Sequence, residues 1–145
     1  MLFRSYENRD VADVDFRNDA VDAGEIGAGH TVTALYEVEL AGDVKEGDAL
    51  TVQMRYLDPK SGQATEIAQP FGRAAFGASF ESANPRFQLA VAVAGFAEVL
   101  KGSEFSTQQS HDQVLTIAER IAPQMARDGD VQEFVELVRR ARDLK

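Results

Sequence analysis

Residues 21–40 read VDAGEIGAGHTVTALYEVEL, a segment punctuated by three glycines that runs into the most regular strand pattern of the chain. From Val32 to Leu40 apolar side chains occupy every second position, and mostly polar ones lie between them. A period of two is typical of a β-strand with one buried face. We therefore predict a strand from Thr31 to Leu40, with Tyr36 in the core.

Two further segments continue this pattern after turn-like stretches. Leu50 to Leu57 again alternates apolar and polar residues, and Ala64 to Gln69 follows a turn that contains Pro59 and Gly62. The third strand is predicted to end at Pro70. Together the three strands predict an antiparallel meander, which could also fold over into a sandwich.

The last third of the chain changes to helical periodicity. We predict three helices that begin near Pro85, His111 and Val131. Each start carries capping residues, namely Asn84, Ser110 with Gln113, and Asp130 with Glu133. The first helix is apolar over most of its circumference, includes Phe96 and stops at Gly102, so we expect it to be central. Pro123 should end or kink the second helix.

These elements predict an α+β fold in one domain of 145 residues, with an antiparallel sheet covered by three C-terminal helices. The predicted parts are an irregular acidic lead-in at 1–30, the meander at 31–70 and a helical half at 82–145. A chain of this length can bury a core without disulfides or a structural metal.

Composition limits the kinds of partner. The net charge is -9, which disfavours nucleic acid and anionic membranes because both would be repelled. No apolar run approaches the ~20 residues that a membrane span requires, so direct membrane insertion is not expected. The chain has no cysteine, which excludes disulfides, thiol nucleophiles and cysteine zinc sites.

The acidic lead-in carries the only metal candidates, Asp13, Asp15 and Asp19. Their spacing resembles the start of a calcium-binding loop, but Arg17 and Gly24 stand where that loop requires a ligand. We predict a solvated acidic loop without a metal. The alternative is a calcium- or small-ligand-binding site around residues 13–30.

Gly24, Gly27 and Gly29 invite comparison with phosphate-binding loops, which need a strand before them and a helix after them. Here a predicted strand follows instead. We interpret these glycines as residues that allow positive φ where the chain turns into the strand. His30 has no second ligand or nucleophile near it in sequence, so we predict a hydrogen-bonding residue at the strand end. No cofactor is expected.

No catalytic residue is predicted. The sequence has no His-x-x-x-His pair and no Gly-x-Ser-x-Gly motif, so zinc-protease and serine-hydrolase mechanisms lack their parts. Arg139, Arg140 and Arg142 lie near the end of a predicted helix, where positive charge suits the helix dipole. We therefore do not interpret them as a nucleic-acid site.

Several segments resemble the uncharacterised C-terminal domain that follows a von Willebrand factor A domain in bacterial YfbK-like proteins: Ser5–Arg9, Asp15–Phe16, Val21–Glu37, Phe87–Ser103 and Glu133–Val138. The resemblance implies no established activity. The A domain's metal-binding Asp-x-Ser-x-Ser loop does not occur in this sequence, so that metal cannot be transferred to it. The resemblance also implies a longer parent protein that is exported or attached to the cell envelope.

We therefore expect a non-catalytic accessory domain for protein–protein interaction or scaffolding. Its expected partner is another protein or the parent's own A domain. Weak self-association is also predicted through the first ~20 residues, because three strands would leave unpaired edges beside Leu2 and Phe3.

Overall fold

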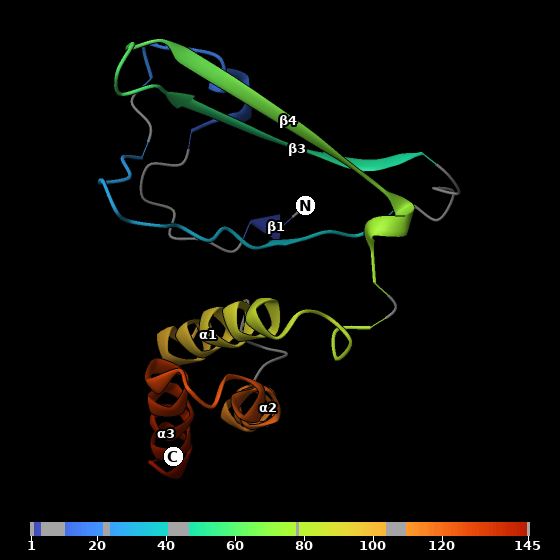
Figure 1. Cartoon of the computed structure of the whole chain (residues 1–145), viewed down its shortest axis with the longest axis vertical. Coiled ribbons are helices and arrows are strands. Elements are labelled where there is room, and N and C mark those ends of the chain that lie inside the picture. The colour runs from blue at the N-terminus through green and yellow to red at the C-terminus, as the bar shows by residue number, and fades with distance from the viewer. Residues whose placement is uncertain are drawn as a thin grey trace. The chain divides into compact units, whose positions relative to one another are not determined.

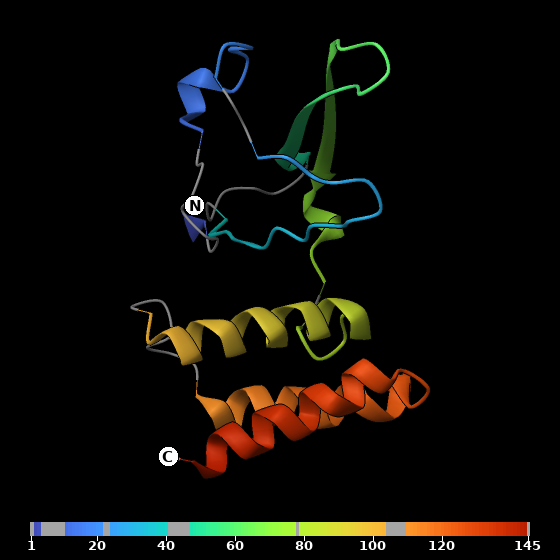
Figure 2. The same ribbon diagram turned by 90° about the vertical axis from the view of Figure 1, so that its left-hand side faces the viewer.

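The computed structural model is α+β, which confirms the predicted class, and it divides into two compact units, Met1–Phe76 and Gly77–Lys145 (Figures 1 and 2). The structure describes residues 2–3, 11–21, 24–40, 47–77, 79–103 and 110–144. Strands occupy the first unit and the three α-helices occupy the second. The boundary between the units therefore falls between the predicted meander and the predicted helical half.

A long hairpin forms the main sheet of the first unit (Figure 1). Strand β3 (Asp48–Leu57) pairs antiparallel with β4 (Ala64–Gly72), and Met54 lies opposite Ile67. Both predicted strands are thus confirmed. The alternation of apolar and polar residues follows the pleat, because successive side chains of a strand point to opposite faces.

The hairpin turn is held by the side chain of Asp58. One of its carboxylate oxygens accepts hydrogen bonds from the main-chain N–H groups of Lys60 and Ser61, each at 2.8 Å. These bonds, that from Ser61 first, lower the pKa of the Asp58 carboxyl. Gly62 has φ 66°, a conformation that glycine adopts without steric cost.

Strand β4 does not end at Pro70, so that prediction is wrong. Pro70 lies within the strand, opposite Thr51 of β3. Proline is tolerated in an edge strand at a position where its nitrogen faces away from the partner. Since the sheet has two strands, β4 is an edge strand, and the pairing continues to Gly72.

The predicted strand from Thr31 to Leu40 is mostly wrong. Only β2 (Tyr36–Glu37) is a strand, and it pairs antiparallel with β1 (Leu2–Phe3) in a second, separate two-stranded sheet. The described strands therefore form neither a meander nor a sandwich. Val32 is 71% exposed and Tyr36 is 49% exposed. An alternating pattern favours a strand through burial of one face, and these side chains are not buried.

The pairing of Leu2–Phe3 with Tyr36–Glu37 also changes the basis of the self-association prediction. The start of the N-terminal arm has a partner within its own chain and is not an open edge on the main sheet. Residues 4–10, the next part of the predicted association segment, lie outside the described residues. Self-association itself stays a prediction.

The second unit consists of α1 (Pro85–Lys101), α2 (His111–Ile121) and α3 (Gly129–Asp143) (Figure 2). Their apolar faces pack on one another and form a single core, made of Ala92, Phe96, Val114, Leu115, Ala118, Ala122, Val131, Val135 and Val138. The predicted coverage of the sheet by these helices stays a prediction. Within the described residues, no helix combines the length and apolarity needed to cross a membrane.

The ends of α1 and the start of α2 confirm the predicted caps. Asn84 accepts a hydrogen bond from the N–H of Arg86 at 2.9 Å, and Gly102 ends the helix with φ 64°. Ser110 and Gln113 form a reciprocal capping box at the start of α2, with bonds of 3.2 and 2.8 Å.

Helix α2 ends before Pro123, as predicted, and continues as the 3₁₀ turn η4 (Ala122–Met125). The predicted start of α3 is wrong by two residues. Asp128 is the N-cap, its main-chain oxygen accepts from the N–H of Gln132 at 3.4 Å, and its side chain makes no cap. Asp130 instead lies in the first turn, where a negative charge suits the helix dipole.

The expectation that α1 is central holds for one of its faces. Phe96 is 6% exposed and packs edge-to-face against His111 and Phe134, with ring centroids 6.0 and 5.8 Å away. Phe87 and Leu100 on the same helix are 49% and 60% exposed. The apolar circumference of α1 therefore reflects a core face together with further apolar side chains that are partly exposed.

Candidate functional site

The three metal candidates of the lead-in, Asp13, Asp15 and Asp19, do not form a metal-binding group. Asp13 and Asp15 lie in the short 3₁₀ turn η1 (Asp13–Asp15), and Asp15 accepts from the side-chain amide of Asn18 at 3.0 Å. Asp19 accepts from the guanidinium of Arg55 at 2.5 Å. In the part of the chain that the structure describes, no group of three or more His, Cys, Asp or Glu side chains could hold a metal ion.

The glycine-containing loop has a local structural explanation. Gly29 has φ 81°, which confirms the predicted positive φ at one of the three glycines. The ring of His30 lies against Gly27, where a Cβ would come within 2.9 Å of its Nδ1 atom. The main-chain N–H of His30 donates to the carbonyl of Gly27 at 3.0 Å. The loop is thus a tight turn packed on the histidine ring.

The β3–β4 hairpin has two chemically different faces, because directly paired residues of antiparallel strands project to the same side. One side carries Gln53, Arg55 and Glu66, the partner of Arg55, and is called the polar face here. The other side carries Leu50, Val52, Met54, Tyr56, Ile67 and Phe71 and is called the apolar face.

The lead-in binds the polar face through two ion pairs. Arg17 donates two parallel hydrogen bonds to the carboxylate of Glu66, at 2.7 and 2.9 Å. Arg55 and Asp19 form the second pair. The hydrogen bond from Arg17 lowers the pKa of Glu66, and the same bond raises that of Arg17. In Figures 1 and 2 the part of the lead-in around η1 lies at the end of the unit that holds the hairpin turn.

Among the described residues of its unit, nothing covers the apolar face. Its exposed side chains are Val52 at 44%, Met54 at 58%, Tyr56 at 43%, Ile67 at 51% and Phe71 at 38%. Their spacing predicted burial, which the described residues of this unit do not provide, and coverage by the helices stays a prediction. Neighbouring exposed apolar side chains on one face are a common feature of interaction surfaces.

The helical unit contains a hydrogen-bonded cluster around a buried polar residue, Gln88. Gln88 is 2% exposed, and its amide donates to the carbonyls of Glu81 and Ala83 at 3.1 and 2.8 Å. Its oxygen accepts from Arg120 at 2.7 Å, and that guanidinium lies 5.7 Å from the Phe80 ring centroid. Every polar atom of the Gln88 side chain is hydrogen-bonded, so we assign the cluster a structural role: it fixes the segment before α1 to α2.

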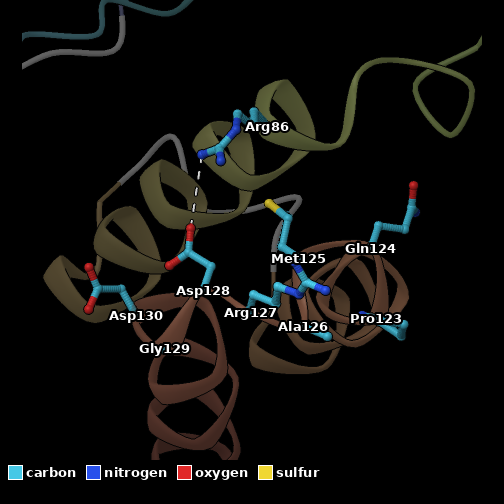
Figure 3. Close-up of a pocket in the computed structure, with 9 residues that line it drawn as sticks. All are labelled: Arg86, Pro123, Gln124, Met125, Ala126, Arg127, Asp128, Gly129 and Asp130. Atoms are coloured by element: carbon cyan, nitrogen blue, oxygen red, sulfur yellow. Dashed lines mark ion pairs between the residues drawn. The ribbon is translucent and has the colours of Figure 1, made fainter.

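An open concavity of about 700 Å³ lies where α2 gives way to α3 (Figure 3). Arg86 reaches it from α1 and points to Asp128, with 4.0 Å between their charged atoms. Arg127 and Asp130 add one charge of each sign. Among the described residues that line the concavity, none carries a hydroxyl, thiol or imidazole group.

The C-terminal arginines are partly paired. Arg139 donates to Glu119 at 2.7 Å and also to Glu136, and these bonds, that to Glu119 first, raise its pKa. Arg142 bonds the neighbouring Asp143 at 2.9 Å. These contacts agree with the structural interpretation of the arginines in helix α3.

Sequence reasoning missed three features. The pairing of Arg17 with Glu66 joins residues 49 positions apart, and no sequence pattern signals such a contact. The burial of His111 at 6% exposure was missed because a histidine in the first turn of a helix gives no signal of burial. For the concavity the sequence gave a partial signal, because Pro123 predicted a break in the helix at that place.

Comparison with known proteins adds the family. A family model described as "Uncharacterized protein YfbK, C-terminal" matches residues 3–48 and 39–144. The chain is also 30% identical over 150 residues to the "Uncharacterized protein YfbK" of Escherichia coli (strain K12). That match covers 92% of this chain and 25% of the relative, so the chain spans about a quarter of the relative's length. No solved structure matches.

The family model covers nearly all of the described residues, including both β3 and β4 and all three α-helices. It also covers every segment whose resemblance was noted from the sequence. This chain therefore belongs to the family of the YfbK C-terminal domain.

Proposed function

We propose that this chain is a non-catalytic domain for protein–protein interaction or scaffolding, which works beside a von Willebrand factor A domain in a longer protein. The observation that carries the proposal is the open apolar face of the β3–β4 hairpin. A two-stranded hairpin is marginally stable alone, and a covering surface would stabilise it by burying that face.

The family relationship supports the longer parent. The E. coli relative has about three further lengths of chain beyond the matched region, since the match covers 25% of it. A neighbouring domain in the same polypeptide would be held at an effective concentration in the millimolar range, so that even a modest interface would be occupied. The resemblance described from the sequence points to an A domain as that neighbour.

The test is to express the upstream region of the parent gene and this domain as two separate chains. We expect titration calorimetry to show a complex of one upstream chain with one domain. The dissociation constant should be about 1 mM or lower, because an interface of that affinity is already occupied at the millimolar effective concentration of linked domains. Absence of binding at this concentration would contradict the proposal.

A further inference from the structure

We propose that the apolar face of the hairpin docks a protein surface whose own apolar patch is bordered by lysine and arginine side chains. This inference rests on the proposed function and adds the chemistry of the partner. It comes from the charge of the unit that carries the hairpin.

Negative charge is concentrated in that unit. Residues 1–76 contain 14 Asp and Glu against 7 Lys and Arg, a net charge of -7. Residues 77–145 contain 10 against 8, a net charge of -2, and together the two units account for the -9 of the chain. The apolar face is thus part of the strongly acidic unit.

Two arginines beside the hairpin are held in ion pairs. Arg17 is bound by Glu66, and Arg55 is bound by Asp19. Both pairs belong to the polar face. Each pair uses one acid as well as one arginine, so the net charge of the unit stays -7 and its field favours positive groups.

This charge decides among the proteins that could cover the face. A second copy would bring another -7 toward the first, and like charges across an interface oppose association. A partner with an apolar surface and a basic border would bury the side chains of the apolar face. Its lysine and arginine side chains would then lie in the attractive electrostatic field of the acidic unit. Such complementarity raises the association rate and excludes wrong partners.

The geometry of the face favours a flat or extended partner segment. Val52, Met54 and Tyr56 follow one another on β3, and Ile67 lies beside Met54 on β4. The contact area of two strands is small compared with that of a stable interface. Charge complementarity therefore gives the interaction the specificity that area alone would not provide.

The first experiment uses two short fluorescent peptides, one in which valine alternates with lysine and one in which valine alternates with glutamate. We expect the full chain to bind the lysine peptide about tenfold or more tightly in fluorescence anisotropy at low salt, and the preference to shrink as salt rises. Equal binding of both peptides would overturn the basic-partner inference. It would leave the proposed function to the test with the upstream chain.

Two variants of the same strand locate the site. Met54→Ser removes an apolar side chain from the apolar face, and Leu57→Ser removes one that is 64% exposed on the opposite side. We expect Met54→Ser to weaken lysine-peptide binding about tenfold, and Leu57→Ser to leave it within about twofold. Equal effects would place the binding elsewhere and overturn the proposal, even if the domain still bound the upstream chain.

Because the chain has no cysteine, a single introduced thiol can test directly which molecule covers the apolar face. In a Met54→Cys variant the new thiol should react with a maleimide at nearly the rate of a free thiol, and the lysine peptide should slow that reaction. Slow labelling of the chain alone at all concentrations would mean that the chain covers the face itself. Slow labelling only at high concentration would identify a second copy. Either result would overturn the proposal.

Discussion

The unit Gly77–Lys145 contains all of the side chains that are buried in the described part of the chain, whereas the described residues of Met1–Phe76 include none. Both units have regular hydrophobic patterns. In the helical unit three apolar stripes meet and exclude water from one another. In the strand unit a two-stranded hairpin has no second layer among the described residues.

The difference between the two units teaches that a regular hydrophobic pattern is necessary for burial but does not by itself bury the side chains. An amphipathic helix can pack on a neighbour along most of its length, so three helices form a small core. A two-stranded sheet presents one apolar face and cannot fold it against itself. The strand unit should therefore be the less stable of the two and the more dependent on a partner.

The largest expected effect is obtained by separating the units. A chain of residues 77–145 should unfold in one cooperative transition in urea, because its core is made of its own helices. A chain of residues 1–76 should give no cooperative transition, because its described side chains are not buried. Circular dichroism and near-ultraviolet spectra, to which tryptophan does not contribute in this chain, would follow the unfolding of both fragments. A cooperative transition in the strand fragment would break the comparison.

The next effect is a truncation in the helical core. Phe96→Ala should reduce the free energy of unfolding by about 3 kcal/mol, because a buried aromatic ring is lost and a cavity remains. Tyr36→Ala, which the sequence pattern suggested would cost as much, should cost less than about 1 kcal/mol because the residue is 49% exposed. Urea melts of the two variants test this.

Leu137→Ala is the control for Phe96→Ala, since Leu137 is helical and 53% exposed. Its effect should lie within about 0.5 kcal/mol of zero. A cost for Tyr36→Ala as large as that for Phe96→Ala would mean that residues 31–40 are buried in solution, as their sequence pattern first suggested.

A smaller effect concerns the start of α2. Ser110→Ala removes the side-chain oxygen that accepts from Gln113 and should destabilise the helical unit by about 1 kcal/mol. Because Gln113 bonds back to Ser110, the double variant with Gln113→Ala should cost less than the sum of the single changes. Additive costs in thermal melts would show that the two bonds act independently.

Much of this fold could be predicted from local sequence signals. The caps at Asn84 and Ser110, the stop at Gly102 and the break at Pro123 each depend on a residue and its near neighbours, and all four are present. The start of α3 was misplaced because Asp130 and Asp128 are both acceptable capping residues, and the choice depends on the preceding turn.

The candidate interaction surface could be predicted only in part. The alternation that contains Val52 and Met54 identified a strand and its apolar face, but not whether a second layer covers that face. The ion pair of Arg17 with Glu66 depends on how the chain returns to the hairpin. Neither property is encoded in a short window of sequence, so both required the three-dimensional arrangement.

The smallest expected effect is the acid response of the hairpin. The pKa of Glu66 is lowered below its ordinary 4.5 by the hydrogen bond from Arg17, and that of Asp58 is lowered below 3.8 by backbone hydrogen bonds. A carboxyl group with a lowered pKa in the folded state stabilises the fold above its ordinary pKa, and this contribution is lost as pH falls through the folded value. The hairpin should therefore loosen below about pH 4.5, and the effect should be small because exposed ion pairs contribute little.

Amide chemical shifts of β3 and β4 between pH 7 and pH 2 would follow this loosening, with Glu66→Gln as the variant that removes the upper part of the response. If Glu66→Gln titrates like the wild type, the ion pair with Arg17 does not hold the lead-in to the polar face. The strand unit would then lack even this tie to its lead-in, and the contrast with the helical unit would become larger.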